Sequence, residues 1–434
     1  MTFDPSATTL GSLTSADRWS GFINSGETEF PHGVAFVGHK DRSVGPTSWG
    51  AVRFVQRAGT MTFGGSVTAD AKANSNYTLV LEGGKVAATD DATLSAFNLI
   101  GITNVNGAAT VEVAADKAFD WPQATNAVGA VLTKIGNGKL RLGGSCQGRI
   151  DVGAGSLALR GGGCFETIAL SSGTRLEFDG HCSVAAIEGL ETADVVPGES
   201  AEYDLAIFTS EDSQLLAAVL ARLNACASDR GSYKIVRNSI VYYRTREAKA
   251  FYWVHNNTPT YYDWSDPASW YTAWTTKPRD PWKDLDTGSN ELQEFPGAQD
   301  LLHWTYGYDT YCAFDLGGKH RYIAGYASDY SKIEYGYREY FIRNGTLEFT
   351  DNYKPFRNWV YIQPNARLIL GPTCAIDLTS DPASSTIHEI KDGAVMEVYG
   401  PTVIGVSRMD VKSGGTLIFD PASLKLGTDR KSVV

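Results

Sequence analysis

The sequence of 434 residues has little charge and no long apolar run. Charged residues make up 20% of it, and 49 acidic residues against 38 basic ones give a formal net charge of −11. A nucleic-acid-binding protein presents a basic face, and no cluster of Lys and Arg is visible, so we expect no nucleic-acid partner. No stretch of 18 apolar residues is present, so we expect no membrane-spanning segment.

The short motifs that mark common reactions are also missing. The sequence contains no HExxH zinc motif, no GxxxxGK[ST] phosphate loop and no CxxC pair with a nearby histidine. Acidic pairs such as Asp377 and Glu397 are easy to find, but outward strand positions are expected to be polar. We therefore assign no catalytic residue, no metal ligand and no cofactor, and keep calcium as an alternative.

The calcium alternative depends on aspartates that gather in one segment. They are Asp263, Asp266, Asp280, Asp284, Asp286 and Asp300. Carboxylates at close quarters are calcium ligands. However, the regular Asp-x-Asp-x-Asp spacing is absent, and aspartates in Pro-rich loops usually cap turns. We favour turn capping for these residues.

What the chain does contain is glycine, at 45 positions, and a short repeat. The repeat reads Gly138-Lys-Leu140-Arg-Leu142, then Gly155-Ser-Leu157-Ala-Leu159, then Gly173-Thr-Arg-Leu176-Glu-Phe178. A turn glycine followed by period-two alternation is typical of a short strand with one buried face. Such strands cannot bury that face alone, so the repeats are predicted to stack in parallel, with Leu140 over Leu157 and Leu142 over Leu159. The pattern predicts an all-β fold of the β-solenoid type, whereas an antiparallel sandwich gives no reason for a constant interval.

Three cysteines follow the same spacing. Cys146, Cys164 and Cys182 are separated by 18 residues each time. The interval predicts a column of packed thiols, Cys146 over Cys164 over Cys182. The alternative is one disulfide between neighbours with the third cysteine left over, because adjacent strands lie within disulfide range.

The strand pattern recurs in both halves of the chain and is interrupted once. Residues 211–227 are predicted to form an α-helix with Ser210 as its N-cap. Its apolar stripe consists of Leu215, Val219, Leu220 and Leu223. We expect it to cover the end of a first array, residues 1–247, whose clearest repeats span 134–187. A second array, residues 248–434, opens with an aromatic-rich region at 250–310.

The aromatic-rich region supplies the candidate ligand-binding residues. They are Tyr261, Tyr262, Trp264, Trp270, Trp274 and Trp282. Their rings could form a sugar-stacking platform, or they could pack as a hydrophobic cap that starts the second array. The cap is favoured, and the platform remains the best binding candidate in the sequence.

Part of the repeat resembles a known family. Lys134-Ile-Gly-Asn-Gly138-Lys-Leu140-Arg-Leu142 and the following Ile150-Asp-Val152-Gly-Ala-Gly155-Ser-Leu157 are similar to the passenger-associated strand repeat of bacterial autotransporters. The resemblance implies a right-handed parallel β-helix from an exported surface protein, and hence an extracellular or cell-surface location. The first 20 residues lack the basic and apolar regions of a signal peptide, so the chain is expected to be a fragment or to use another route.

These observations give three functional hypotheses. The first is a non-enzymatic structural or adhesin-like module that presents loops to carbohydrate or to another cell-envelope component. The second is a polysaccharide-active lyase or glycoside hydrolase on a β-helix scaffold, with acids on one outer face. The third is a phage or envelope assembly component. The oligomeric state does not follow from the sequence.

Overall fold

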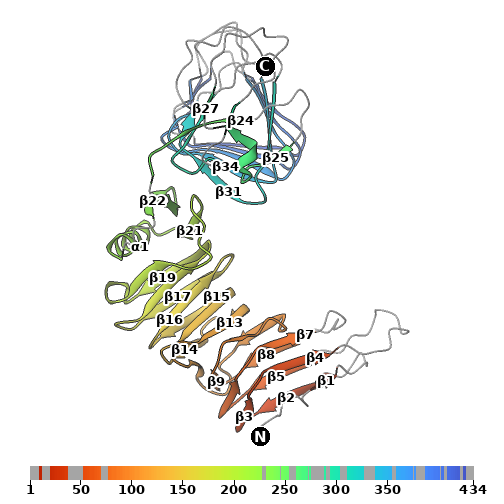
Figure 1. Cartoon of the computed structure of the whole chain (residues 1–434), viewed down its shortest axis with the longest axis vertical. Helices are drawn as coiled ribbons and strands as arrows, with labels where there is room; N and C mark the ends of the chain where they lie inside the picture. The colour runs from red at the N-terminus through yellow and green to blue at the C-terminus, as the bar shows by residue number, and fades with distance from the viewer. Residues whose placement is uncertain are drawn as a thin grey trace, which may run out of the picture. The chain divides into compact units, whose positions relative to one another are not determined.

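The computed structural model describes residues 9–11, 20–37, 52–69, 77–226, 231–244, 246–253, 261–271, 273–274, 288–289, 294–303, 310–326, 338–353, 358–374, 376–377, 387–400, 402–404, 408–420 and 424–426. These residues form mostly short β-strands and one α-helix, and they divide into two compact units (Figure 1). Unit 1 comprises Met1–Glu202 and Ala206–Tyr242, and unit 2 comprises Tyr203–Leu205 and Tyr243–Val434. The chain passes from unit 1 to unit 2 mainly at Tyr243, a few residues before the boundary that the sequence predicts at 247/248.

The strands of unit 1 form three long parallel ladders. One ladder contains β2 (Ser20–Asn24), β5 (Val52–Gln56), β8 (Tyr77–Leu81), β11 (Leu99–Ile102), β13 (Ala118–Asn126), β15 (Lys139–Val152), β17 (Cys164–Leu170), β19 (Cys182–Glu188) and β21 (Ala206–Thr209). A second contains β3 (Glu27–Phe30), β6 (Thr60–Phe63), β9 (Gly84–Ala88), β12 (Ala109–Val113), β14 (Val131–Ile135) and the ends of β15, β17 and β19. A third contains β10 (Ala92–Thr93), the starts of β13 and β15, β16 (Ser156–Arg160), β18 (Arg175–Asp179) and β20 (Asp194–Pro197). The strands β1 (Thr9–Gly11), β4 (Val34–Val37) and β7 (Val67–Ala69) form a separate parallel sheet.

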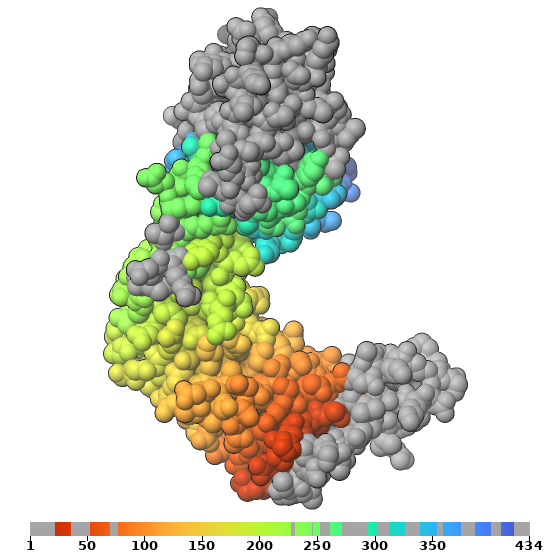
Figure 2. Space-filling view, in the orientation of Figure 1, coloured from red at the N-terminus to blue at the C-terminus, as the bar shows by residue number. Residues whose placement is uncertain are grey.

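Single strands of unit 1 take part in more than one ladder. The start of β15 pairs with β13 and β16, its middle with β13 and β17, and its end with β14 and β17. The strands follow one another along the unit in chain order, as the colours of the surface show by changing steadily (Figure 2). We call one set of consecutive strands that supplies all three ladders, such as β16 and β17, a pass of the chain. Each pass pairs with the pass before it and the pass after it.

The predicted leucine columns are confirmed. Leu140 pairs with Leu157, which pairs with Leu176, and Leu142 pairs with Leu159. All five side chains are fully buried. Burial of a leucine side chain contributes about 1.5–3 kcal/mol, so repetition of one apolar position from pass to pass builds a continuous core.

The predicted cysteine column is wrong. Cys146 pairs with Phe165, and Cys164 pairs with Ser183, so no two of the three cysteines share a column. Four residues separate Leu159 from Cys164, whereas three separate Leu142 from Cys146. One additional residue turns a strand side chain to the opposite face, so Cys164 is exposed while Cys146 is buried. All three are free thiols.

Lys134 has a structural role in the repeat that carries the family resemblance. Its side chain is buried, and its amine donates hydrogen bonds to the carbonyl oxygens of Gly136, Gly138 and Ala154, the last two at 2.7 Å. Burial lowers the pKa of Lys134 to about 8. The lysine thus satisfies carbonyl groups of two stacked turns, which explains the Lys-x-Gly-x-Gly pattern without a ligand.

The helix α1 (Ser213–Ala225) follows β21, and its start differs from the prediction. Asp212, not Ser210, is the N-cap, because its carboxylate accepts hydrogen bonds from the backbone N–H groups of Gln214 and Leu215. The buried side chains are Leu215, Leu216, Val219 and Leu223. The predicted stripe was therefore wrong at one position, since Leu216 is buried and Leu220 is only half-buried.

The helix packs where the parallel ladders of unit 1 end. It contacts β20, the short helix η1 (Leu190–Thr192) and β22 (Ser232–Val236). The strand β23 (Ser239–Tyr243) then pairs with β21 in the antiparallel direction. The parallel pattern of this ladder therefore ends at β21, next to the covering helix.

Unit 2 is also built from parallel ladders. Its six-stranded sheet contains β25 (Tyr261–Asp263), β30 (Thr310–Asp315), β33 (Arg338–Arg343), β35 (Asn358–Ile362), β38 (Ile387–Ile390) and β41 (Arg408–Val411). A five-stranded sheet contains β31 (His320–Ile323), β34 (Gly345–Phe349), β36 (Ala366–Leu370), β39 (Val395–Val398) and β42 (Thr416–Phe419). Smaller sheets contain β24 (Ala250–Trp253), β26 (Trp270–Tyr271), β29 (Leu301–His303) and β32 (Gly325–Tyr326); β27 (Ala273–Trp274) and β28 (Gly288–Ser289); and β37 (Ile376–Asp377), β40 (Thr402–Ile404) and β43 (Leu424–Leu426). The core again stacks like residues, with Leu347 on Leu368 on Met396.

Candidate functional site

The two central tryptophans of the aromatic-rich region lie in the core of unit 2. Trp264 and Trp270 are 0% and 1% exposed, and their rings meet edge to face with centroids 4.9 Å apart. The Trp264 indole donates a hydrogen bond to the carbonyl oxygen of Pro296, and the Trp270 indole donates to that of Trp264. Because their rings are closed off from solvent, these two residues pack as the cap interpretation expects.

The other residues of the predicted platform are only partly described. Tyr261 and Tyr262 are half-buried. The Arg343 guanidinium lies 3.8 Å from the centroid of the Tyr261 ring. Trp274 lies in β27, but its side chain and the whole of Trp282 fall outside the described residues.

A half-buried aromatic column runs beside Tyr261 on the six-stranded sheet. Phe341 meets Tyr261 edge to face at 6.5 Å and stacks on Tyr361 at 4.7 Å with an interplanar angle of 11°. The Lys391 amine lies 5.6 Å from the Tyr361 ring centroid. Ring faces that a sugar would use are therefore largely taken up by neighbouring rings and cations, and this column stabilises the sheet.

The described aspartates of the proposed calcium cluster serve turns and an ion pair. Asp263 accepts hydrogen bonds from the backbone N–H and hydroxyl of Ser265, and Asp266 caps the short helix η2 (Pro267–Ser269). Asp300 is fully buried and binds Arg246 with two hydrogen bonds of 2.6 and 2.7 Å. Asp280, Asp284 and Asp286 lie outside the described residues. Within the described part of the chain, no three His, Cys, Asp or Glu side chains come together as metal ligands.

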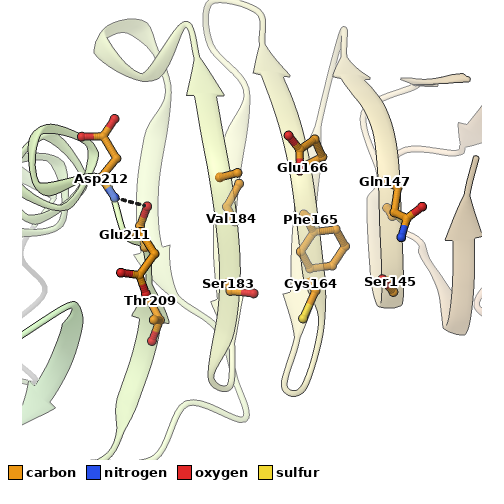
Figure 3. Close-up of a pocket in the computed structure, with 13 residues that line it drawn as sticks. Ser145, Gln147, Cys164, Phe165, Glu166, Ser183, Val184, Thr209, Glu211 and Asp212 are labelled. Carbon is orange, nitrogen blue, oxygen red and sulfur yellow. Dashed lines mark hydrogen bonds between the residues drawn. The ribbon is translucent and has the colours of Figure 1, made fainter. Parts of the chain in front are cut away.

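The candidate site is a groove on unit 1 with a volume of about 620 Å³ (Figure 3). It crosses β15, β17, β19 and β21 and ends at the loop that precedes α1. Its lining residues come from positions 145–147, 164–166, 183–185 and 209–212. The groove is thus built from equivalent short segments of four successive passes.

Small polar side chains form a row along this groove. Ser145 pairs with Cys164, Cys164 with Ser183, and Ser183 with Thr209, and Figure 3 shows the four side by side across the strands. Alternation turns them outward, because the residue that follows each of them points inward. Those inward neighbours are Cys146, Phe165, Val184 and Ser210, all of them buried. Adjacent strands lie about 4.8 Å apart, so the row places one hydroxyl or thiol at each such step.

A second row lies two residues further along each segment. It consists of Gln147, Glu166, Ala185 and Glu211, all of them exposed. Ala185 leaves a low point between Glu166 and Glu211, which are two passes apart. The groove therefore has a floor row of hydroxyl and thiol groups and a rim of amide and carboxylate groups, and the nearly buried Phe165 and Val184 line it between the two rows (Figure 3).

Hydrogen bonds fix the end of the groove near α1. The Thr209 hydroxyl contacts His181 Nε2 at 2.6 Å and the Ser239 hydroxyl at 2.9 Å. The Asn238 side-chain amide donates to the Glu211 carboxylate at 2.8 Å. These contacts hold the terminal hydroxyl and carboxylate of the two rows in place.

The charge of the groove is negative. Its lining includes the carboxylates of Glu166, Glu211 and Asp212 and no Lys or Arg. Burial raises the pKa of the Cys146 thiol to about 12, which makes that cysteine inert, whereas Cys164 is exposed on the groove floor. The lining offers hydrogen-bond donors, acceptors and negative charge, but no cation to stabilise an anionic ligand.

The sequence did not point to this groove. The row depends on the register between β15, β17 and β19, and the equal cysteine interval indicates a different register. A signal was present in the sequence, because the turn before Cys164 is one residue longer than the turn before Cys146. This difference aligns Cys164 with Ser145 and Ser183 and not with the other two cysteines.

Comparison with known proteins gives no relative. No family model, no curated protein and no solved structure matches the chain. Among the described helices, none combines the length and apolar character needed to cross a membrane. Any functional argument therefore depends on the groove and the stacked strands themselves.

Proposed function

We propose that the chain is a right-handed β-solenoid module of a cell-surface or secreted protein that binds carbohydrate in the unit 1 groove without cleaving it. The solenoid assignment is supported by strands that pair in parallel with the preceding and following pass in three ladders. The cell-surface location and the handedness rest on the resemblance of residues 134–159 to the autotransporter passenger repeat.

The observation that carries the binding proposal is the row of Ser145, Cys164, Ser183 and Thr209 beneath the rim carboxylates. Carbohydrates are recognised through many hydrogen bonds to hydroxyl groups, and this groove provides donors and acceptors at regular steps. Because its lining extends over four successive strands, the groove suits a chain of sugars better than a single compact ligand. Small floor side chains also let such a chain approach the strands closely.

A glycoside hydrolase is the second candidate, because Glu166 and Glu211 face the same groove. Glycosidases use two carboxyl groups on either side of the bond that is cleaved. Here Glu211 is held by Asn238 at the end of the groove, and a lyase-type arginine is absent from the lining residues. Binding without cleavage is therefore the function that the arrangement favours.

A glycan-binding screen on the folded chain, combined with an assay for released reducing ends, tests the proposal. We expect binding without release. A groove-filling variant, Ser183→Trp, should abolish binding, while Ala186→Trp, at an exposed position on the same strand outside the groove lining, should retain it. Release of reducing ends supports the hydrolase instead, and binding that survives Ser183→Trp contradicts the assigned site.

A further inference from the structure

We infer that the unit 1 groove prefers an oligosaccharide that carries amino groups, a cationic amino-sugar chain, over neutral or acidic glycans. This inference rests on the proposed carbohydrate function and specifies the ligand of the same site. It is carried by the charge balance of the groove lining, which contains three carboxylates and no Lys or Arg.

Many carboxylates of unit 1 outside the groove form ion pairs with lysine or arginine. Glu82 is paired with Arg57 at 2.8 Å, Glu112 with Lys85 at 2.7 Å, and Glu188 with Arg149 at 2.7 Å. The partners lie one or two passes of the chain apart, as with Arg149 on β15 and Glu188 on β19. Pairing is thus frequent on unit 1 but not general, because the exposed Glu29 has no ion pair with a described residue.

The rim carboxylates of the groove have no cationic partner among the described residues. Glu166 forms no hydrogen bond or ion pair with any described residue, and it is exposed beside the floor row. Glu211 accepts only from the neutral Asn238 amide. Two negative charges thus remain available at the rim, where a ligand ammonium group would make charge-assisted hydrogen bonds.

The third carboxylate, that of Asp212, caps the N-terminus of α1, which would otherwise favour an anion. The N-terminus of a helix attracts negative charge through its free N–H groups. In α1, the Asp212 carboxylate already accepts from the N–H groups of Gln214 and Leu215. An acidic sugar would therefore meet carboxylates on the rim and a helix terminus that is already capped.

The floor supplies the specificity for a sugar rather than for any cation. Ser145, Ser183 and Thr209 present neutral hydroxyl groups in a row that also contains the Cys164 thiol, with about 4.8 Å between neighbouring strands. The amines of a basic peptide could pair with the rim carboxylates, but they offer no hydroxyl groups to this row. Ring hydroxyls would bind this row while amino groups reach Glu166 and Glu211. The two rows together thus match a chain in which hydroxyl and ammonium groups alternate.

Calorimetry on the full chain tests the inference with four probes of six units each. They are the hexamers of glucosamine, N-acetylglucosamine and galacturonic acid, and hexalysine. We expect the glucosamine hexamer to bind at least tenfold more tightly than the N-acetyl hexamer at low ionic strength, with the difference shrinking as salt screens the exposed rim. Glu166→Gln should weaken glucosamine binding about tenfold and leave the N-acetyl hexamer unchanged. Glu29→Gln removes an equal charge from an exposed position on β3 and should change neither.

The outcomes separate this inference from the function on which it rests. Equal binding of the glucosamine and N-acetyl hexamers, or tighter binding of galacturonic acid, overturns the amino-sugar preference and leaves a carbohydrate groove. Hexalysine binding as tightly as the glucosamine hexamer overturns the assignment to sugars. If none of the three sugars binds, the proposed function itself fails.

Discussion

Leu157 provides a quantitative test of the stacked core of unit 1. Its side chain is fully buried between Leu140 and Leu176, which are also fully buried. Replacing a buried leucine by alanine costs about 2–5 kcal/mol, and neighbours above and below hinder collapse of the cavity, so we expect about 3 kcal/mol or more for Leu157→Ala. Leu157→Asp places an unpaired carboxylate in the same column and should unfold the surrounding passes.

Denaturant unfolding followed by circular dichroism measures both effects. The control is Ala186→Asp, which introduces the same group at an exposed position on β19 and should change stability by about 0.5 kcal/mol or less. The reasoning is refuted if Leu157→Asp is soluble with an unchanged spectrum and melting curve. Such a result would mean that Leu157 does not face the interior.

Three further predictions address the register, the cap and a buried histidine. Ser183→Cys should form a disulfide with Cys164 on oxidation, because the two positions are register partners, whereas a Cys146–Cys164 disulfide in the unmodified protein would contradict the register. Trp270→Ala should destabilise unit 2 by about 3–5 kcal/mol without abolishing glycan binding, so loss of binding in a variant that remains folded would argue for the platform. His388 is fully buried against the Tyr353 hydroxyl, and burial lowers its pKa from 6.5 to about 4. The unfolded chain therefore takes up a proton before the folded one does, so unit 2 should lose about 3 kcal/mol of stability as pH falls from 6.5 to 4. Denaturation of His388→Met at both pH values should show a smaller loss, and an equal loss would assign the acid sensitivity to other groups.

The leucine columns could be predicted because a turn glycine followed by alternating apolar residues indicates a short strand with one buried face. Residues such as Leu140, Leu157 and Leu176 are buried, and the regular interval between them favours stacking like on like over an antiparallel sandwich. The helix was predictable for a similar reason, since its apolar spacing breaks the period of two. Its N-cap was misplaced because Ser210 and Asp212 are both good capping residues, and in the structure the Ser210 hydroxyl accepts from the backbone N–H of Asp212 while Asp212 caps the helix.

The groove could not be predicted because it depends on a single residue in a turn. The longer turn before Cys164 reverses its orientation relative to Cys146, and a register shift of one moves a whole strand to the other face. The aromatic region posed the opposite difficulty. Burial and ligand stacking both favour tryptophan, so composition alone cannot separate the buried Trp264 and Trp270 from a binding surface.

The most direct test of the groove is the rate at which Cys164 reacts with a maleimide, with and without a glycan found in the binding screen. Cys164 is exposed on the groove floor, and Cys226, half-buried at the end of α1, serves as the internal reference outside the groove. We predict that the glycan slows modification of Cys164 in proportion to occupancy and leaves Cys226 unaffected. Equal rates at Cys164 with and without saturating glycan would contradict the central claim that carbohydrate binds along this row of strands.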